Sequence, residues 1–459
     1  MNIPPIKNAL ENIITACQKK LSYLYPTGVP EPIQIRYEQE LSFFKHSKYI
    51  DDFEIFRLLS EEANKSSYII SARGTIMGSF LYYLLGTNCY NPLPVYYYCP
   101  KCGYYEAVQT HLFGIDLPEK TCPNCDNTIY ADGFNLSTES VWGLDGKKII
   151  SFDYNVCSEF LPFAKRILTK IYPNNIISSW GMFQIDPVTQ MPHPDQRVIG
   201  VGLAGYAILP TGNIIDDYSE LISYLEDGEP CLTGGGWELE QNQIKAVRLF
   251  SFEYIDKLMS LQRATGLYVN ELSISSLRDI TWSNIFNTTT LCQQTSMLFH
   301  ELKPKTFRDM IALEASAHNT TIWQKQGEMY IDFYDFTKMT STEAFKKYPC
   351  FTREDFFDYL IESEVDRETA FLASEMIRKG QASEKTCTSH WHEKFHSLQI
   401  PEEIKEVAKN YLYLFPRAHC IEYVLIFARL AYYAKTDSRA FSKIIFKKKS
   451  QFTNGLYHI

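Results

Sequence analysis

Two closely spaced cysteine pairs constrain the fold of this chain more than any other feature. Cys99 and Cys102 form one Cys-x-x-Cys pair, and Cys122 and Cys125 form the second, with nineteen residues between the pairs. Each pair can wrap a tight turn around one metal ion, and the spacing is typical of tetrahedral four-cysteine zinc sites. Because all four positions are filled, we expect a structural zinc ion rather than a catalytic one. The alternative is a pair of turns with free thiols.

The composition is that of an ordinary globular protein. The chain has 459 residues, 45% hydrophobic and 22% charged, which excludes a disordered chain and allows large cores. No basic region followed by an apolar run opens the sequence, and the apolar stretch Tyr423–Ala434 contains Arg429 and is too short to span a membrane. We therefore expect a cytoplasmic protein without a membrane partner, whose scattered cysteines are reduced.

Charge is distributed unevenly along the chain. The net charge of −9 argues against a protein whose whole surface grips nucleic acid. The C-terminal segment is the exception, because it holds one acid, Asp437, among seven basic residues: Arg429, Lys435, Arg439, Lys443, Lys447, Lys448 and Lys449. Three interpretations of this basic segment stay open: it binds DNA, it binds an acidic protein, or it is a solvated end of the chain. Binding to DNA would depend on the salt concentration.

Residue patterns predict a mixed N-terminal part and a helical C-terminal part. Helical patterns dominate after about residue 265, where Thr352, Asp366 and Pro401 mark helix starts, the last for a helix over 402–414. Short runs with strand-like alternation predict strands at 67–71, 148–153, 206–209 and 244–250.

The order of several motifs resembles one known family. The segments 73–79 and 91–94 precede the cysteine pairs, and Phe152–Asn155 follows them. Further matching segments keep the same order: 200–210, 303–307, 317–323, 415–420, 423–425 and Arg429. Together they resemble the core of PolC-type replicative DNA polymerases, the polymerase III alpha subunit of low-GC Gram-positive bacteria, over residues 30–435.

The resemblance implies an α+β fold with a nucleotidyltransferase-like polymerase palm. The implied parts are the N-terminal part of the palm (1–95), a zinc ribbon insertion (96–130), a palm strand with a relic Asp-x-Asp motif (131–158), a shortened thumb (159–197), the rest of the palm (198–262) and an α-helical fingers-like region with a basic end (263–459). The family's chemistry is two-metal phosphoryl transfer, in which three aspartates hold two Mg²⁺ ions.

The resemblance also implies relic nucleotide- or phosphate-binding residues. These are Arg73, Gly74, Gly78, Ser79, Gly205, Arg417, His419 and Arg429. Two readings stay open for several of them: Arg73 binds a phosphate or braces the palm, and Arg417 with His419 forms an anion pocket or packs a helix.

The departures from the family fall on the chemistry. Ser151 stands at the first aspartate of the Asp-x-Asp motif, while Asp153 keeps the second, either as a relic metal ligand or as a polar strand end. The third aspartate falls on Val247 or Arg248, and neither is an acid. Met77 replaces a glycine of the phosphate turn, where we expect its side chain to obstruct close approach.

Further departures affect the Gly-rich segments and the architecture. Gly202–Ala204 stands where the family has His-Pro-Gly, and Gly234–Gly236 replaces a segment rich in His and acids. Only 41 residues separate Asn155 from Arg197, where the family has a longer thumb, and we expect the family's exonuclease, duplex-binding and clamp-binding parts to be absent.

These features favour a catalytically inactive polymerase core that acts as a binding or regulatory module on DNA, a nucleotide or replication proteins. One alternative is a divergent active polymerase that uses Mg²⁺ and a rearranged carboxylate set such as Asp153 with Glu159, Glu238 or Glu253. Another is a structural partner subunit. Geometry discriminates between the inactive core and the divergent polymerase. Two carboxylates close to Asp153 would allow a metal site, whereas an Arg248 side chain that points at Asp153 would form a salt bridge in the place of the metal.

Overall fold

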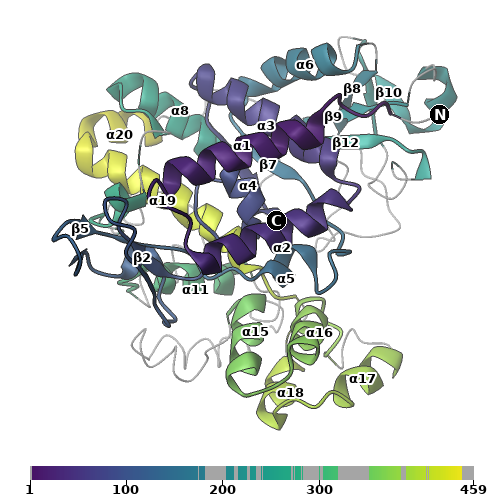
Figure 1. The fold of residues 1–459 in the computed structure, drawn as a ribbon. Coiled ribbons are helices and arrows are strands. Elements are labelled where there is room, and N and C mark those ends of the chain that lie inside the picture. The colour runs from purple at the N-terminus through teal and green to yellow at the C-terminus, as the bar shows by residue number, and fades with distance from the viewer. Residues whose placement is uncertain are drawn as a thin grey trace.

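The fold is mixed α/β, with helices on both sides of one large sheet (Figure 1). The computed structural model describes residues 3–173, 175–180, 203–210, 215–224, 228–233, 241–269, 274–280, 303–318, 351–383, 389–409 and 413–446, and the single residues 239, 272, 282, 299 and 411. Within these residues no helix is both long enough and apolar enough to cross a membrane.

The main sheet is mixed in strand direction and has the order β1-β7-β12-β9-β8-β11-β10. Strand β7 pairs antiparallel with β1 and parallel with β12, and β12 pairs antiparallel with β9. The strand bounds are β1 Ile70–Arg73, β7 Asp153–Val156, β8 Ile176–Trp180, β9 Leu203–Ile208, β10 Ile222–Tyr224, β11 Pro230–Leu232 and β12 Lys245–Ser251.

Helices near the N-terminus cover one face of the sheet through aromatic packing. Tyr154 of β7 points to this face, where its ring stacks on Phe56 of α3 with 4.5 Å between centroids. The Tyr82 hydroxyl of α4 donates a hydrogen bond to the Tyr154 hydroxyl (2.7 Å). The helices of this part are α1 Ala9–Leu24, α2 Glu31–Lys45, α3 Ile50–Lys65, α4 Phe80–Leu84, α5 Thr138–Trp142 and α6 Phe160–Ile171.

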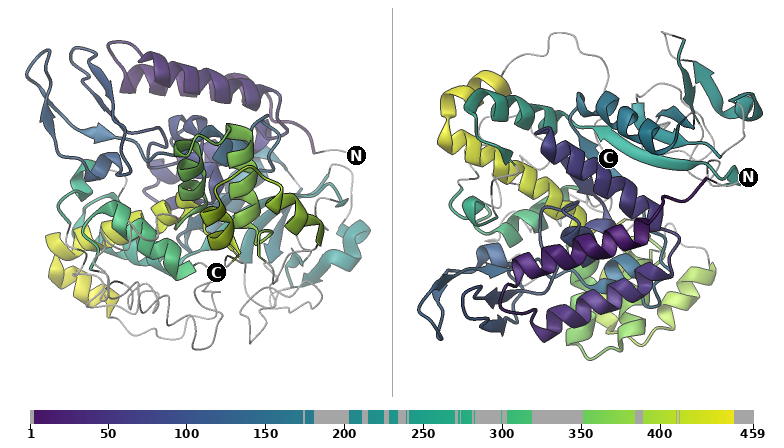
Figure 2. Two further views of the ribbon diagram at one scale, coloured as in Figure 1. Left: turned by 90° about the horizontal axis from the view of Figure 1, so that it is seen from below. Right: turned by 45° about the horizontal axis from the view of Figure 1, so that its top comes forward.

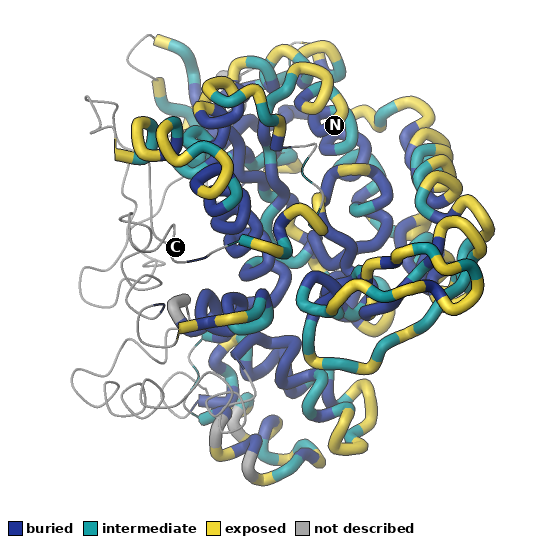
Figure 3. The backbone as a smooth tube through the Cα atoms, turned by 90° about the vertical axis from the view of Figure 1, so that its left-hand side faces the viewer, coloured by how far each residue is buried: buried dark blue, intermediate teal, exposed yellow. Residues whose placement is uncertain are grey.

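Helix α19 (Arg417–Thr436) lies against the opposite face. It is buried along nearly its whole length, which explains why its sequence is apolar on all sides. Figures 1 and 2 show α19 and α20 (Ser438–Ile445), in yellow, running from the green helices toward α8 (Glu253–Thr265). Figure 3 shows the buried backbone concentrated in the middle of the molecule.

A group of short helices forms a second hydrophobic core apart from the first. Its centre includes Phe356, Leu360, Ile377 and Phe395, all fully buried. The helices of this group are α15 Arg353–Glu362, α16 Arg367–Arg378, α17 Ser389–His396 and α18 Glu402–Ala408. Another helix, α11 (Phe307–His318), packs instead on α19 in the main core.

The cysteine segment, residues 96–132, forms two small sheets of its own. Strands β2 Tyr96–Tyr98, β3 Tyr105–Ala107 and β6 Ala131–Asp132 make one, and β4 Lys120–Thr121 with β5 Thr128–Ile129 makes the other. A small core that includes Val95, Cys99, Cys122 and Ile129 fills the space between them.

Several predicted elements have other bounds in the structure. The strand predicted at 148–153 is wrong except at Asp153, where β7 begins. The backbone before Asp153 is not paired with a neighbouring strand; the Ile150 amide instead donates a hydrogen bond to the Tyr49 hydroxyl (3.0 Å). The strand predicted at 67–71 begins later, since the Tyr68 amide closes α3 on the Ala63 carbonyl. The helix predicted at 402–414 ends at Ala408.

Other predicted elements are confirmed. Strands β9 and β12 match the predictions at 206–209 and 244–250 to within a few residues. Thr352 and Asp366 cap α15 and α16 through their side chains, as predicted. Strand β8 belongs to the main sheet, so the sheet extends into the segment 159–197 that the resemblance assigns to a thumb.

Candidate functional site

The main sheet brings Arg73, Asp153, Arg248 and Gly205 into one row. Asp153 at the start of β7 is paired with Arg73 of β1 on one side and with Arg248 of β12 on the other, and Gly205 of β9 is paired with Arg248. Directly paired residues of neighbouring strands project to the same face of a sheet. The row therefore faces α19, away from Tyr154 and the N-terminal helices.

Arg248 forms an ion pair with Asp153, with 2.6 Å between Arg248 Nε and Asp153 Oδ1. The register shows which of Val247 and Arg248 shares the face of Asp153; that either replaces a third aspartate stays a prediction. Val247 is 1% exposed and projects to the other face, so Arg248 holds the position beside Asp153. The side chain beside Asp153 on β12 is thus a guanidinium, and Ser151, two residues before Asp153, carries no charge.

The carboxylates proposed as substitutes have other partners. Glu159 accepts both of its hydrogen bonds from the Arg263 guanidinium (2.7 Å each), and Glu253 pairs with Lys257 (3.1 Å). Glu238 lies outside the described residues, as do Gly202 and Gly234–Gly236. Among the residues that the structure describes, the four cysteines are the only group of three or more His, Cys, Asp or Glu side chains placed to share a metal ion.

Behind the row, a buried polar cluster joins the sheet to α19. The Asn155 amide donates to Glu422 Oε1 (2.7 Å), and Arg73 Nη1 lies 3.5 Å from Asn155 Oδ1 with its guanidinium over the Phe250 ring. Glu422 is fully buried. Burial raises the pKa of Glu422 to about 8, although Arg73 and the hydrogen bond from Asn155 act in the opposite direction.

Sequence reasoning missed Glu422. The only signal in the sequence is an acid placed directly before the apolar run that begins at Tyr423. An acid in a helix that is buried on all sides needs partners, and Asn155 supplies one of them.

The glycine-serine turn after β1 is braced from within. Glu40, which is fully buried, accepts hydrogen bonds from Ser79 Oγ (2.6 Å), the Phe80 amide (3.0 Å), Arg36 Nε (2.6 Å) and Trp142 Nε1 (3.1 Å). The Ser79 hydroxyl and the first amide of α4 are thus committed to Glu40.

The glycines of this turn differ in their surroundings. Gly74 has a φ of +85°, and a Cβ on it would meet nothing within 4 Å, so the turn is open there. At Gly78 a Cβ would lie 2.9 Å from Ser140 and from Val141, which makes this glycine a packing requirement. Met77 is fully buried in the main core, so the expected obstruction of the turn by its side chain is wrong.

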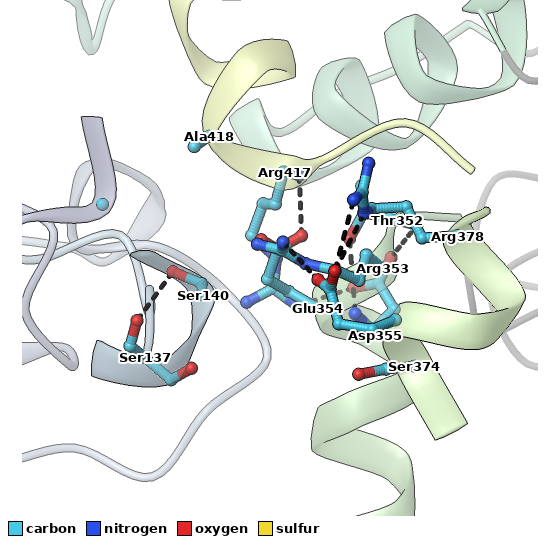
Figure 4. Close-up of polar contacts among 12 residues, drawn as sticks. Ser137, Ser140, Thr352, Arg353, Glu354, Asp355, Ser374, Arg378, Arg417 and Ala418 are labelled. Atoms are coloured by element: carbon cyan, nitrogen blue, oxygen red, sulfur yellow. Dashed lines mark hydrogen bonds and ion pairs between the residues drawn. The ribbon is translucent and has the colours of Figure 1, made fainter. Parts of the chain in front are cut away.

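Arg417 belongs to a buried ion-pair network at the start of α19 (Figure 4). Its guanidinium pairs with Asp355 (2.8 Å) and Asp358 (2.7 Å) and donates to the Asn135 carbonyl (2.7 Å). The network also contains Arg353, Glu354, Glu375, Arg378, Lys148 and Arg308. Arg417 therefore fastens α19 to α15.

The other two predicted residues of α19 lie in its packed faces. The His419 ring stacks between Phe415 (4.7 Å between centroids) and Tyr423 (5.5 Å). Arg429 is 6% exposed, and its Nε has no hydrogen-bond partner among the described residues. The packing of His419 and the burial of Arg429 do not test a role in nucleotide binding, so that role stays a prediction for both residues.

The four cysteines converge as their spacing predicts. Their sulfur atoms all lie within 4.8 Å of one another, contributed by the turns after β2 and β4. Zn–S bonds of about 2.3 Å in a tetrahedron place the sulfurs about 3.8 Å apart. The cluster fits a zinc ion, and its four thiolates would fill the coordination sphere.

Three basic residues are exposed on the two consecutive helices α19 and α20. Lys435 lies in the last turn of α19, and Arg439 and Lys443 lie one turn apart in α20. We name these three residues the basic ridge. Lys447, Lys448 and Lys449 lie outside the described residues.

Comparisons with known proteins agree with the motif order. Residues 11–183 match the family model described as "Bacterial DNA polymerase III alpha NTPase domain". "DNA polymerase III PolC-type" of Thermotoga maritima is 23% identical over 94% of the chain and 34% of that protein, and its namesake in Bacillus subtilis is 25% identical over 94% of the chain and 32% of that protein. The chain thus spans about a third of the length of these curated relatives. These similarities confirm the resemblance to PolC-type DNA polymerase III, over residues 11–183 for the family model and over 94% of the chain for the two relatives.

Proposed function

We propose that this chain is a PolC-like palm and fingers core that has lost metal-dependent nucleotidyl transfer and serves as a binding module. The Asp153–Arg248 ion pair is the observation that carries the proposal. Two-metal catalysis needs carboxylates that share two dications, and most of its rate enhancement comes from that electrostatic arrangement. A guanidinium that is ion-paired with the remaining aspartate repels a dication and neutralises the carboxylate that would hold it.

The proposal assigns the parts of the fold as follows. The main sheet, with the N-terminal helices, is the palm, and the helices after residue 263 are the fingers region. The cysteine segment is a zinc ribbon, supported by the converging sulfurs and by its separate small sheets. The segment 159–197 corresponds to the thumb, reduced here to α6 and a sheet strand in its described part.

DNA is the partner that the charge distribution favours. The basic ridge is exposed on a chain whose net charge is −9, so it is a local positive surface on an acidic protein. Lysine and arginine side chains on such a surface bind phosphates with release of counterions. Replication proteins that bind the same DNA are further partners under this proposal.

Primer extension tests the loss of catalysis. Zinc-loaded protein is incubated with a primed template, nucleotides and either Mg²⁺ or Mn²⁺, with Asp153→Ala as the matched control. We expect no extension by either protein. Primer extension by the wild type that disappears in Asp153→Ala would overturn the proposal and favour the divergent active polymerase instead.

A salt titration of DNA binding tests the partner. Replacing Lys435, Arg439 and Lys443 by Ala should weaken binding and flatten the dependence of log K on log salt, with a slope smaller by up to about three. The control replaces three exposed lysines at the N-terminal end, Lys7, Lys19 and Lys45, by Ala, which changes the net charge equally. Equal effects of the two triple variants would contradict a specific role of the basic ridge.

A further inference from the structure

The row around Asp153 carries a positive charge without any metal ion. Two guanidinium groups, Arg73 and Arg248, flank the single carboxylate of Asp153, and Ser151 adds no charge. Glu422, the nearest acid on α19, lies behind the row and is bonded to Asn155. Burial raises the pKa of Glu422 to about 8, which reduces its compensation of the charge of Arg73 near pH 7.

The ion pair in this row is accessible. The Arg248 side chain is 41% exposed and that of Asp153 is 22% exposed. On the β9 side the residue paired with Arg248 is Gly205, which has no side chain to cover it; a Cβ there would lie 2.2 Å from the Val247 carbonyl oxygen. On the β1 side the turn at Gly74 is open as well. A solute can therefore reach the guanidinium of Arg248 from the face of the sheet.

We propose that Arg248, assisted by Arg73, binds a phosphate ester anion directly, in place of the divalent metal ions that carboxylates would hold at this position. A guanidinium offers paired N–H donors in a plane, which match the oxygens of a phosphate. Asp153 competes with the phosphate for the same donors, so binding exchanges one anionic partner of Arg248 for another. The inference rests on the proposed function, since it requires that no metal occupies the row.

This arrangement predicts two results that differ from those expected of a metal site. Binding should be indifferent to removal of Mg²⁺, because the cation is part of the chain. Asp153→Asn should strengthen binding, since it removes the internal competitor, whereas in a carboxylate–metal site the same change would weaken it. The shared chemistry is a phosphate ester, and its source is either a DNA end or a nucleoside triphosphate.

The test measures binding of a fluorescent primer-template and, separately, of dATP, each in EDTA and in Mg²⁺. Arg248→Ala should weaken binding of at least one of them about tenfold in both buffers. Arg263→Ala is the matched control, because Arg263 is also exposed and pairs with a carboxylate, Glu159, at 2.7 Å; it should change little. A thermal melt of each variant checks folding.

The two ligands distinguish the sources. An effect of Arg248→Ala on the primer-template alone assigns the site to DNA, and an effect on dATP assigns it to a triphosphate; either supports the inference. Equal affinities of Arg248→Ala and Arg263→Ala would overturn it, as would binding that needs Mg²⁺ and weakens in Asp153→Asn. Primer extension by the wild type would refute the proposed function, whereas unchanged binding in Arg248→Ala without extension would refute this inference alone.

Discussion

Glu422 is the residue whose charge state depends most on the fold. It is fully buried in α19, hydrogen-bonded to Asn155 and close to Arg73, and burial raises its pKa to about 8 from an ordinary value of 4.5. The folded protein therefore holds a proton on Glu422 at pH values where the unfolded chain has released it. Between about pH 4.5 and 8, this group makes the folded state progressively less stable as the pH rises.

Glu422→Gln should remove this pH dependence. An amide has nearly the same shape and accepts the hydrogen bond from Asn155 without a titrating group. The free energy of unfolding of the variant, from urea titrations at pH 5 to 8, should fall less steeply with pH than that of the wild type. Glu362→Gln, an exposed glutamate with a side chain 58% exposed, is the control. Parallel curves for wild type and Glu422→Gln would contradict the raised pKa.

At the scale of elements, the cysteine segment connects the N-terminal helices to the helical region. The hydroxyls of Tyr25 and Tyr96 lie 2.7 Å apart, which ties β2 to the end of α1. Asp116 accepts hydrogen bonds from the Phe307 and Arg308 amides and so caps α11. Arg278 donates to backbone carbonyls of the same segment, those of Gly114, Ile115, Leu117 and Ala131.

Zinc removal should therefore loosen α11. With the cysteine turns released, Asp116 no longer holds its place, and amides at the start of α11 should exchange hydrogen faster. Hydrogen exchange of peptides covering 307–318 measures the effect, and peptides covering α16 are the internal control. Asp116→Ala should raise exchange at the same amides with zinc bound, at a cost of about 1 kcal/mol. Protection unchanged by chelation would show that the segment does not fasten α11.

These element-scale links also show where sequence prediction succeeds and fails. Local chemistry identified the cysteine pairs, the caps Thr352 and Asp366, and strand β12, because each depends on neighbours in the sequence. The resemblance also predicts lost carboxylates at Ser151 and at Val247 or Arg248, and that loss stays a prediction. The partners of Asn155 were not, because Glu422 is 267 residues away and only the packing of α19 on the sheet brings them together.

At the scale of the whole molecule, a buried ion-pair network joins two hydrophobic cores. Arg417 at the start of α19 pairs with Asp355 and Asp358 of α15, and Lys148 bonds with Glu375 of α16. The helices α15–α18 have a core of their own, so these contacts carry much of their attachment to the main body. Arg308 and Arg417 outweigh burial and keep the pKa of Asp355 below its usual value.

Arg417→Ala should destabilise the protein strongly. It leaves Asp355 and Asp358 with fewer partners, and breaking a buried pair by removal of one member costs about 3–5 kcal/mol. Asp366→Ala, which removes only the cap of α16, should cost about 1 kcal/mol. Urea unfolding followed by circular dichroism measures both. Equal costs for the two variants would show that the network does not hold the cores together.

We propose that Arg248 takes the place of a metal ion beside Asp153. Titration of zinc-loaded protein with Mn²⁺, followed by electron paramagnetic resonance, tests this claim. The wild type should leave Mn²⁺ free, whereas the double variant Ser151→Asp and Arg248→Asp should bind it and lose that binding when Asp153→Ala is added. Binding of Mn²⁺ by the wild type that disappears in Asp153→Ala would contradict the claim.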